Sequence, residues 1–223
     1  MSIKAFTVVY NTPKLLMDSV GSFRKYYPDI PLLIMNNSDP DNACTDLILE
    51  LVQRDAKITA VHYEKNQGHG YAFNDAMNIL ESDYVYYFDS DTIMFKGGAI
   101  EQMVGIMDDN IYGAGKIIYT DMGGRGIPRD YDGEKLRYLY LVVGMLNRKM
   151  YHKFHHWTKF GLIAYKAMVD IHDNGDPENM LKEFPIMSYV RHLSGGTRSK
   201  FGDCEDIVEG FRGRKADMTS ELD

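Results

Sequence analysis

The sequence has few cysteines, no long apolar run and no excess of positive charge. Its two cysteines, Cys44 and Cys204, are too few and too far apart for a disulfide framework or a zinc site, so we expect a reducing, cytoplasmic location. The longest apolar run, at 139–146, is too short to span a bilayer, and the first residues lack a signal-peptide profile. We therefore expect no stable membrane anchor.

The charge balance argues against binding to nucleic acid. The 25 Lys and Arg residues are outnumbered by 32 Asp and Glu residues, giving a formal net charge of −7. A surface that neutralises nucleic-acid phosphates needs the opposite sign. Hydrophobic residues make up 44% and charged residues 26% of the chain, which is typical of a soluble globular protein.

Strand-like and helix-like segments alternate through the first part of the chain. Short runs rich in β-branched and aromatic residues predict four strands, at 5–10, 32–35, 58–63 and 84–88. Between them, apolar residues recur at helical spacing, as in Leu16, Val20, Phe23 and Tyr27. This order predicts an α/β fold with a mostly parallel sheet flanked by helices.

The pattern is looser in the rest of the chain. Residues 121–133 are rich in glycine and charge and predict a loop. Residues 162–172 predict a helix, and 188–192 predict a short strand that runs into the glycine-rich segment SGGTR.

Polar residues follow the predicted strands where each strand ends. Asn11 follows the first strand, 36–38 follow the second, Asn66 follows the third, and Asp89 and Asp91 follow the fourth. In parallel sheets the carboxyl ends of the strands form one edge, and ligands bind there. We therefore expect these side chains to converge on a single site.

Two carboxylates at the end of a buried strand suit a divalent cation. Asp89 and Asp91 offer hard oxygen ligands that can hold Mn²⁺ or Mg²⁺ and leave positions for phosphate oxygens. The same Asp-x-Asp spacing recurs at 39–41 and 130–132. Those copies stand in turn-like polar surroundings, where a solvated loop is expected.

The order of four motifs, YNTP, LLIMNNSD, NQGHGYAFNDAMN and YVYYFDSDT, resembles the family 2 glycosyltransferases of the GT-A fold. The later run YVRHLSGGTR resembles the C-terminal histidine segment of the rhamnosyl- and galactofuranosyl-transferase branch. The resemblance implies a metal-dependent enzyme, using Mn²⁺ or Mg²⁺. Its donor would be a nucleotide diphosphate sugar, most often a UDP-sugar in this family, and its acceptor the hydroxyl of a glycan or another molecule.

The resemblance also implies a single GT-A-like domain over 1–223. Residues 1–120 would form the nucleotide-sugar-binding half, and 121–223 a smaller acceptor-side half with a closing loop. No internal repeat or linker interrupts this division.

Seven residues are implied on the nucleoside side: Val9, Tyr10, Asn11, Asn36, Asn66, Gly68 and Gly70. Asn36 stands where the family usually has an aspartate that contacts the base, so the base is not fixed by the resemblance. The glycines would let the backbone approach the ligand. The three asparagines have an alternative role as turn residues, which asparagine favours.

On the diphosphate side, the resemblance implies that Asp89, Ser90 and Asp91 contact ribose, diphosphate and metal. His192 would be the third protein ligand of the metal, and 195–198 would close over the diphosphate, with Arg198 able to grip it through two hydrogen bonds. A structural histidine and a solvated arginine are the alternatives.

The general base of the family is missing from its usual place. The family carries a pair of acidic residues at the start of the helix upstream of the histidine, and 161–164 contain no carboxylate. An inverting transfer needs a group that removes the acceptor proton. His156 is the preferred substitute, with Asp170, His155 or an acidic residue of 121–133 as alternatives.

Aromatic residues lie beside several of these positions. Trp157, the only tryptophan, is a candidate sugar-stacking platform, with a core indole as the alternative. Tyrosine is abundant, with 16 residues. Those within strands are expected in the core, and others, such as Tyr10 and Tyr71, are expected near the site.

Other function classes fit less well. A nucleotide- or carbohydrate-binding module that has lost transfer activity stays open, because the base is missing. A phosphotransferase with an Asp-x-Asp-x-Thr loop would need threonine where Ile93 stands. A nucleotidyltransferase would need a glycine-rich basic loop after the first strand, and the chain has VVYNTPKLL there.

Overall fold

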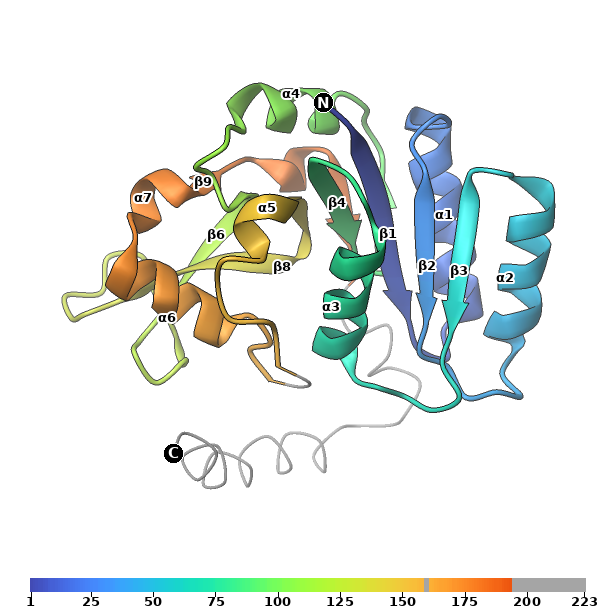
Figure 1. Cartoon of the computed structure of the whole chain (residues 1–223), viewed down its shortest axis with the longest axis horizontal. Helices are drawn as coiled ribbons and strands as arrows, with labels where there is room; N and C mark the ends of the chain where they lie inside the picture. The colour runs from blue at the N-terminus through green and yellow to red at the C-terminus, as the bar shows by residue number, and fades with distance from the viewer. Residues whose placement is uncertain (159–160, 194–223) are drawn as a thin grey trace. The chain divides into compact units, whose positions relative to one another are not determined.

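The computed structural model describes residues 1–158 and 161–193. Its main sheet consists of β1 (Ile3–Val9), β2 (Leu32–Asn36), β3 (Ile58–His62), β4 (Tyr84–Phe88), β6 (Gly113–Thr120), β7 (Gly126–Ile127), β8 (Leu136–Asn147) and β9 (Leu181–Glu183). The strand order is β3-β2-β1-β4-β8-β6-β7, with β9 paired to β6 (Figure 1).

The sheet has a parallel part and an antiparallel part. Strands β1 to β4 pair in parallel with one another, as the alternation of strands and helices predicts. Strand β8 runs antiparallel between β4 and β6, so β7, β8 and β9 share one sheet with strands of the first half. The predicted fold class, an α/β domain with a mostly parallel sheet and flanking helices, is confirmed.

The helices are α1 (Pro13–Tyr26), α2 (Ala43–Arg54), α3 (His69–Ile79), α4 (Ala99–Ile106), α5 (Arg148–Tyr151), α6 (Tyr165–Asn174) and α7 (Pro177–Met180), with a 3₁₀ turn η1 (Ile186–Ser188). Helix α1 begins with proline in its first turn, a position that suits the fixed φ of proline. Helix α6 starts later than the predicted 162, because 162–164 form a turn in which the Tyr165 amide donates to the Leu162 carbonyl (2.8 Å). None of the described helices combines the length and apolar character needed to cross a bilayer.

Helices cover the sheet on both faces. Along β4, alternate side chains point to opposite faces, so Tyr86 packs with α1 residues such as Phe23, and Tyr87 packs with Phe73 of α3. Helices α1, α2 and α4 contribute to one core cluster, and α3, α5 and α6 to the other. The strand tyrosines therefore lie in the core, as expected.

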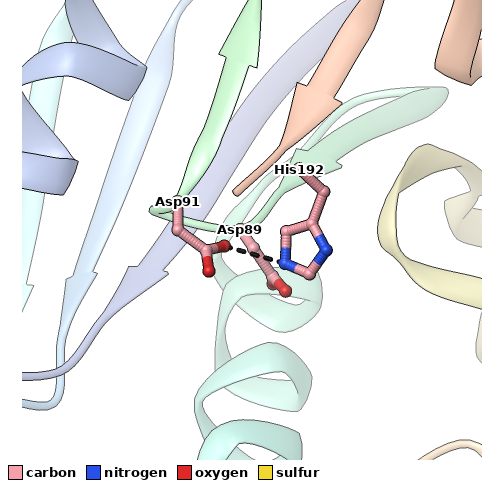
Figure 2. A group of neighbouring side chains, drawn as sticks. All are labelled: Asp89, Asp91 and His192. Carbon is pink, nitrogen blue, oxygen red and sulfur yellow. Dashed lines mark ion pairs between the residues drawn. The ribbon is translucent and has the colours of Figure 1, made fainter. Parts of the chain in front are cut away.

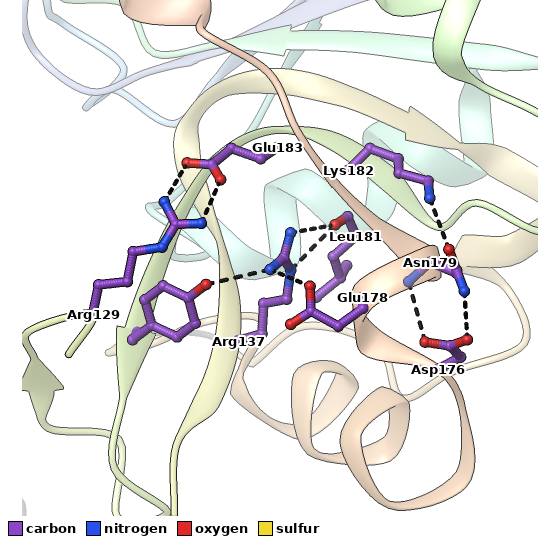
Figure 3. Close-up of polar contacts among 9 residues, drawn as sticks. Arg129, Arg137, Asp176, Glu178, Asn179, Leu181, Lys182 and Glu183 are labelled. Carbon is purple, nitrogen blue, oxygen red and sulfur yellow. Dashed lines mark hydrogen bonds and ion pairs between the residues drawn. The ribbon is translucent and has the colours of Figure 1, made fainter. Parts of the chain in front are cut away.

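Two arginines, Arg129 of the segment between β6 and β8 and Arg137 of β8, anchor this part of the chain to the β9 region (Figure 3). Arg129 makes two hydrogen bonds with Glu183 (3.0 and 3.3 Å). Arg137 is only 8% exposed, and it donates to the Leu181 carbonyl and to the Glu178 carboxylate (2.8 Å). Part of the predicted loop also pairs with the sheet as β7.

A second, two-stranded sheet joins distant parts of the chain. It pairs β5 (Thr92–Met94) antiparallel with β10 (Val190–His192), where the sequence predicts a short strand at 188–192. The register places His192 opposite Thr92. This pairing brings a histidine from late in the chain next to the end of β4.

Candidate active site

Asp89, Asp91 and His192 form a cluster at the carboxyl edge of the parallel strands (Figure 2). Each residue offers one ligand atom, and these atoms lie within 4.8 Å of one another. The backbone fixes the cluster, since the Asp89 amide donates to the Val142 carbonyl of β8 (2.8 Å) and the Thr92 amide donates to the Asp89 carbonyl (3.0 Å). The chain thereby turns at the end of β4 and carries both aspartates toward His192.

His192 is bound directly to Asp91. Its Nε2 lies 3.0 Å from Asp91 Oδ1, and the Leu193 amide donates to the Asp91 carbonyl (3.0 Å). The hydrogen bond to Asp91 raises the pKa of His192. Burial, and then the charge of Asp91, raise the pKa of Asp89 to about 8.

These features fit a divalent cation. Two carboxylates that are crowded and partly buried favour a compensating positive charge, and a set of two oxygens and one imidazole nitrogen suits a metal such as Mn²⁺. The three residues could therefore hold a metal and leave the remaining coordination positions for other oxygen ligands.

His69 also contacts this cluster, and it is not among the site residues predicted from the sequence. His69 is the first residue of α3, and its Nε2 lies 3.6 Å from Asp89 Oδ1. Burial lowers the pKa of His69 to about 4, so the imidazole is neutral at pH 7. Its position inside the NQGHGY motif, between two glycines already considered, was the signal that could have identified it.

The polar residues after β1 and β2 do converge, and they bind one another. Asn11, which has a positive φ of 53°, donates from its amide nitrogen to Asp39 (2.6 Å). Asn36 is 2% exposed and its side chain contacts Thr45 (3.2 Å) and His62 (3.0 Å). These contacts connect the segment after β1 with the segment after β2, and Asn36 with α2 and β3.

The turn before α3 is held in the same way. Asn66 accepts a hydrogen bond from the Gly68 amide (2.7 Å), and Asn37 of the neighbouring turn donates to the Gly68 carbonyl (3.2 Å). Gly70 packs against Thr158 and Ile163, because a Cβ atom there would lie 1.7 Å from the Thr158 carbonyl oxygen and 3.1 Å from the Ile163 Cβ. The close backbone approach at Gly70 is therefore to the protein itself.

Other predicted residues of the site are buried to different extents. Val9 is fully buried at the end of β1, whereas Tyr10 and Ser90 are half-buried. Arg198 and the rest of 195–198 lie outside the described residues.

Trp157 lies in the core. The indole is 1% exposed, it packs against Phe73 with ring centroids 3.8 Å apart, and its Nε1 donates to the Tyr112 hydroxyl (3.1 Å). The ring presents no open face to a sugar, so the predicted stacking platform is wrong and the core alternative holds. Burying the indole satisfies its one polar group within the protein.

The candidate bases lie around the start of α6. Asp170 accepts from the His155 backbone amide (3.0 Å), and the His155 ring nitrogen Nδ1 contacts the same carboxylate. His156 is exposed and stacks on Tyr151. In the 121–133 segment, Asp121 accepts from the amides of Gly123 and Arg125 and so caps its own turn.

Curated relatives match part of the chain. An uncharacterized glycosyltransferase of Methanocaldococcus jannaschii is 26% identical over 110 residues, 48% of this chain and 38% of that protein. An uncharacterized glycosyltransferase of Haemophilus influenzae is 24% identical over 139 residues, 61% of this chain and 55% of that protein. The chain thus spans only about a third to a half of the length of these relatives.

Solved structures share the fold at low sequence identity. A mannosyltransferase from Pyrobaculum calidifontis, in complex with GDP-Man and Mn²⁺, superposes with a TM-score of 0.62 at 8% identity, over 82% of this chain and 54% of that chain. TarS of S. aureus (residues 1–349) in complex with UDP-GlcNAc gives a TM-score of 0.58 at 16% identity, over 85% of this chain and 58% of that chain.

The family model of glycosyl transferase family 2 matches residues 5–169. The matched range includes β1 to β4, both aspartates of the cluster and the start of α6. The chain belongs to glycosyl transferase family 2.

Proposed function

We propose that this protein transfers a sugar from a nucleotide diphosphate sugar, with a UDP-sugar as the expected donor, to an acceptor hydroxyl. Mn²⁺ or Mg²⁺ would be held by Asp89, Asp91 and His192. The observation that carries the proposal is the clustering of these three residues at the edge of the parallel strands where ligands bind. The Mn²⁺ and nucleotide sugars in the complexes of the fold neighbours support it.

The chain's own residues would orient the donor. His192 would align the Asp91 carboxylate through its contact of 3.0 Å. A divalent cation in this position supplies a positive charge that stabilises the departing diphosphate. The residues at the ends of β1 and β2 would border the nucleoside. They include Tyr10 and Asn36, whose side chain also contacts Thr45 and His62. The histidine on β10 is the feature that favours the rhamnosyl- and galactofuranosyl-transferase branch.

For the general base, we propose the group formed by Asp170, His155 and His156. Asp170 fixes His155 through the ring and the backbone, which is how a carboxylate orients an imidazole that takes up a proton. His156 is exposed beside it. Asp170→Asn should lower kcat at least tenfold and leave the donor Kd unchanged. An unaltered kcat in this variant and in the double variant His155→Gln/His156→Gln would exclude the group.

Calorimetric titration with UDP tests the metal site. Wild-type protein should bind UDP at least tenfold more tightly with Mn²⁺ than with EDTA, and Asp91→Asn should remove this difference. Asp130→Asn is the matched control, because it changes an exposed aspartate of another Asp-x-Asp pair. Binding of UDP that is independent of metal, in wild type and variant alike, would contradict the proposed site.

A binding module without transfer activity is the competing function. The missing acidic pair at 161–164 is the specific feature that favours it. Slow hydrolysis of a UDP-sugar in the presence of Mn²⁺ would support the enzyme. Metal-dependent binding with neither hydrolysis nor transfer to glycan, lipid-linked or protein acceptors would support the module.

A further inference from the structure

The two carboxylates of the cluster are each approached by a histidine, from different elements of the fold. His192 of β10 is hydrogen-bonded to Asp91 (3.0 Å). His69 of α3 approaches Asp89 from the helix, with 3.6 Å between Nε2 and Oδ1. The first histidine belongs to the cluster of mutually close ligand atoms, whereas the second does not. The two histidines therefore have different relations to the site.

The core fixes the His69 ring. Its plane is nearly parallel to that of Phe73, one helical turn later, with an interplanar angle of 21° and centroids 6.2 Å apart. Phe73 in turn contacts Phe6 edge-on (4.5 Å between ring centroids) and the tilted ring of Trp157 (3.8 Å). The side chain of His69 is still 40% exposed, so the imidazole packs against Phe73 on one face and is accessible to solvent elsewhere.

The Asp89 carboxylate has few other constraints. Within residues 1–158 and 161–193, no hydrogen bond to its side-chain oxygens is found, and the neutral His69 ring is the one histidine or basic side chain in contact with them. The separation of 3.6 Å is slightly too long for a hydrogen bond, and a small rotation of either side chain would close it. Histidine and carboxylate groups that bind a metal commonly depend on such outer partners for their orientation.

From this geometry we propose that His69 is a positioning residue of the metal centre, which holds the Asp89 carboxylate in the orientation that binds the divalent cation. The inference rests on the proposed function, because it concerns the same metal. It adds a residue outside the three ligands and places it on α3, opposite the histidine of β10.

The test is an isothermal calorimetric titration, in which Mn²⁺ is added to the full chain at a fixed concentration of UDP. His69→Phe should keep the stacking on Phe73 and remove both ring nitrogens. It should weaken Mn²⁺ binding about tenfold, the lower end of the range for outer partners of metal ligands. His69→Gln, which keeps a donor, should lose less. His172→Gln is the matched control, since His172 also faces a carboxylate, that of Glu134, at 3.7 Å.

A spectroscopic readout separates positioning from direct coordination. Electron spin echo measurements on bound Mn²⁺ should detect the same directly coordinated nitrogen in wild type and in His69→Phe, and should lose it in His192→Gln. Unchanged Mn²⁺ affinity in His69→Phe, with an unchanged melting temperature, would overturn the inference. So would the loss of a coordinated nitrogen, which would make His69 a ligand. If wild-type protein binds no Mn²⁺ at all, the proposed metal site itself is excluded. If wild-type protein binds Mn²⁺ and His69→Phe binds it equally well, only the role of His69 is excluded, so the two failures are distinguishable.

Discussion

At the scale of single residues, Gly70 shows how little space separates α3 from the segment that follows α5. The Cβ atom of an alanine at this position would lie 1.7 Å from the Thr158 carbonyl oxygen and 2.8 Å from its carbon. Backbone atoms cannot swing aside as the end of a flexible side chain can. The glycine therefore sets how closely the helix carrying His69 packs against its neighbour.

Gly70→Ala should destabilise the protein by about 1–3 kcal/mol, the usual range for overpacking, as measured by urea unfolding. Gly21→Ala is the matched control, because Gly21 lies inside helix α1 with no atom within 4 Å of an added Cβ. That variant should gain about 0.5–1 kcal/mol. Equal stability of the two variants would show that the Thr158 segment moves away at no cost.

The sequence predicts the positions of the site residues better than their contacts. The sequence correctly predicts that Asp89 and Asp91 follow a buried strand. This prediction depends only on recognising the short strand and the residue at which it ends. The partners of Asn36 come from β3 and α2, and those of Trp157 come from α3 and from Tyr112, the residue before β6. Contacts between elements distant in the chain cannot be derived from local spacing, so the roles of these two residues had to be learned from the structure.

At the scale of elements, the two arginines beside β9 differ in what they stabilise (Figure 3). Arg137 is buried and satisfies the Leu181 carbonyl with two of its nitrogens. Arg129 is exposed and pairs with Glu183 at the surface. Exposed ion pairs contribute little to stability, whereas a buried carbonyl that loses its donor is costly.

Arg137→Met should therefore lower the free energy of unfolding by about 1–3 kcal/mol, while Arg129→Met should leave the melting temperature unchanged. Thermal unfolding followed by circular dichroism measures both. A larger loss in Arg129→Met than in Arg137→Met would show that the surface pair, and not the buried guanidinium, anchors this part of the sheet.

The antiparallel part of the sheet was the hardest element to predict. The apolar run at 139–146 lies within β8, and it lacks a polar–apolar alternation because β8 is covered on both faces. The pairing of β8 with β6 shifts register beside Lys116, so residues 140–143 lie between the two stretches of β8 that pair with β6. A continuous apolar run specifies neither the direction nor the register of its strand, so neither feature could be predicted from this run.

At the scale of the whole molecule, the cluster of Asp89, Asp91 and His192 joins segments that are far apart in the chain. Asp89 and Asp91 leave the main sheet at β4, while His192 arrives on β10, which pairs with β5 over three residues. A two-stranded pairing of this size is marginally stable by itself. It adjoins a hydrophobic cluster through Val190 and Tyr189, which supplies much of its support.

This small pairing is expected to open and close locally far more often than the main sheet unfolds, so occupancy of the metal site should be visible as slower amide exchange. With Mn²⁺ and UDP, amides of residues 190–193 should gain protection in hydrogen–deuterium exchange, because an ion held by His192 and both aspartates disfavours the open form. The C-terminal turn of α2 serves as the internal control. Equal changes in both places would mean that the strand carrying His192 does not respond to the ion separately from the rest of the fold.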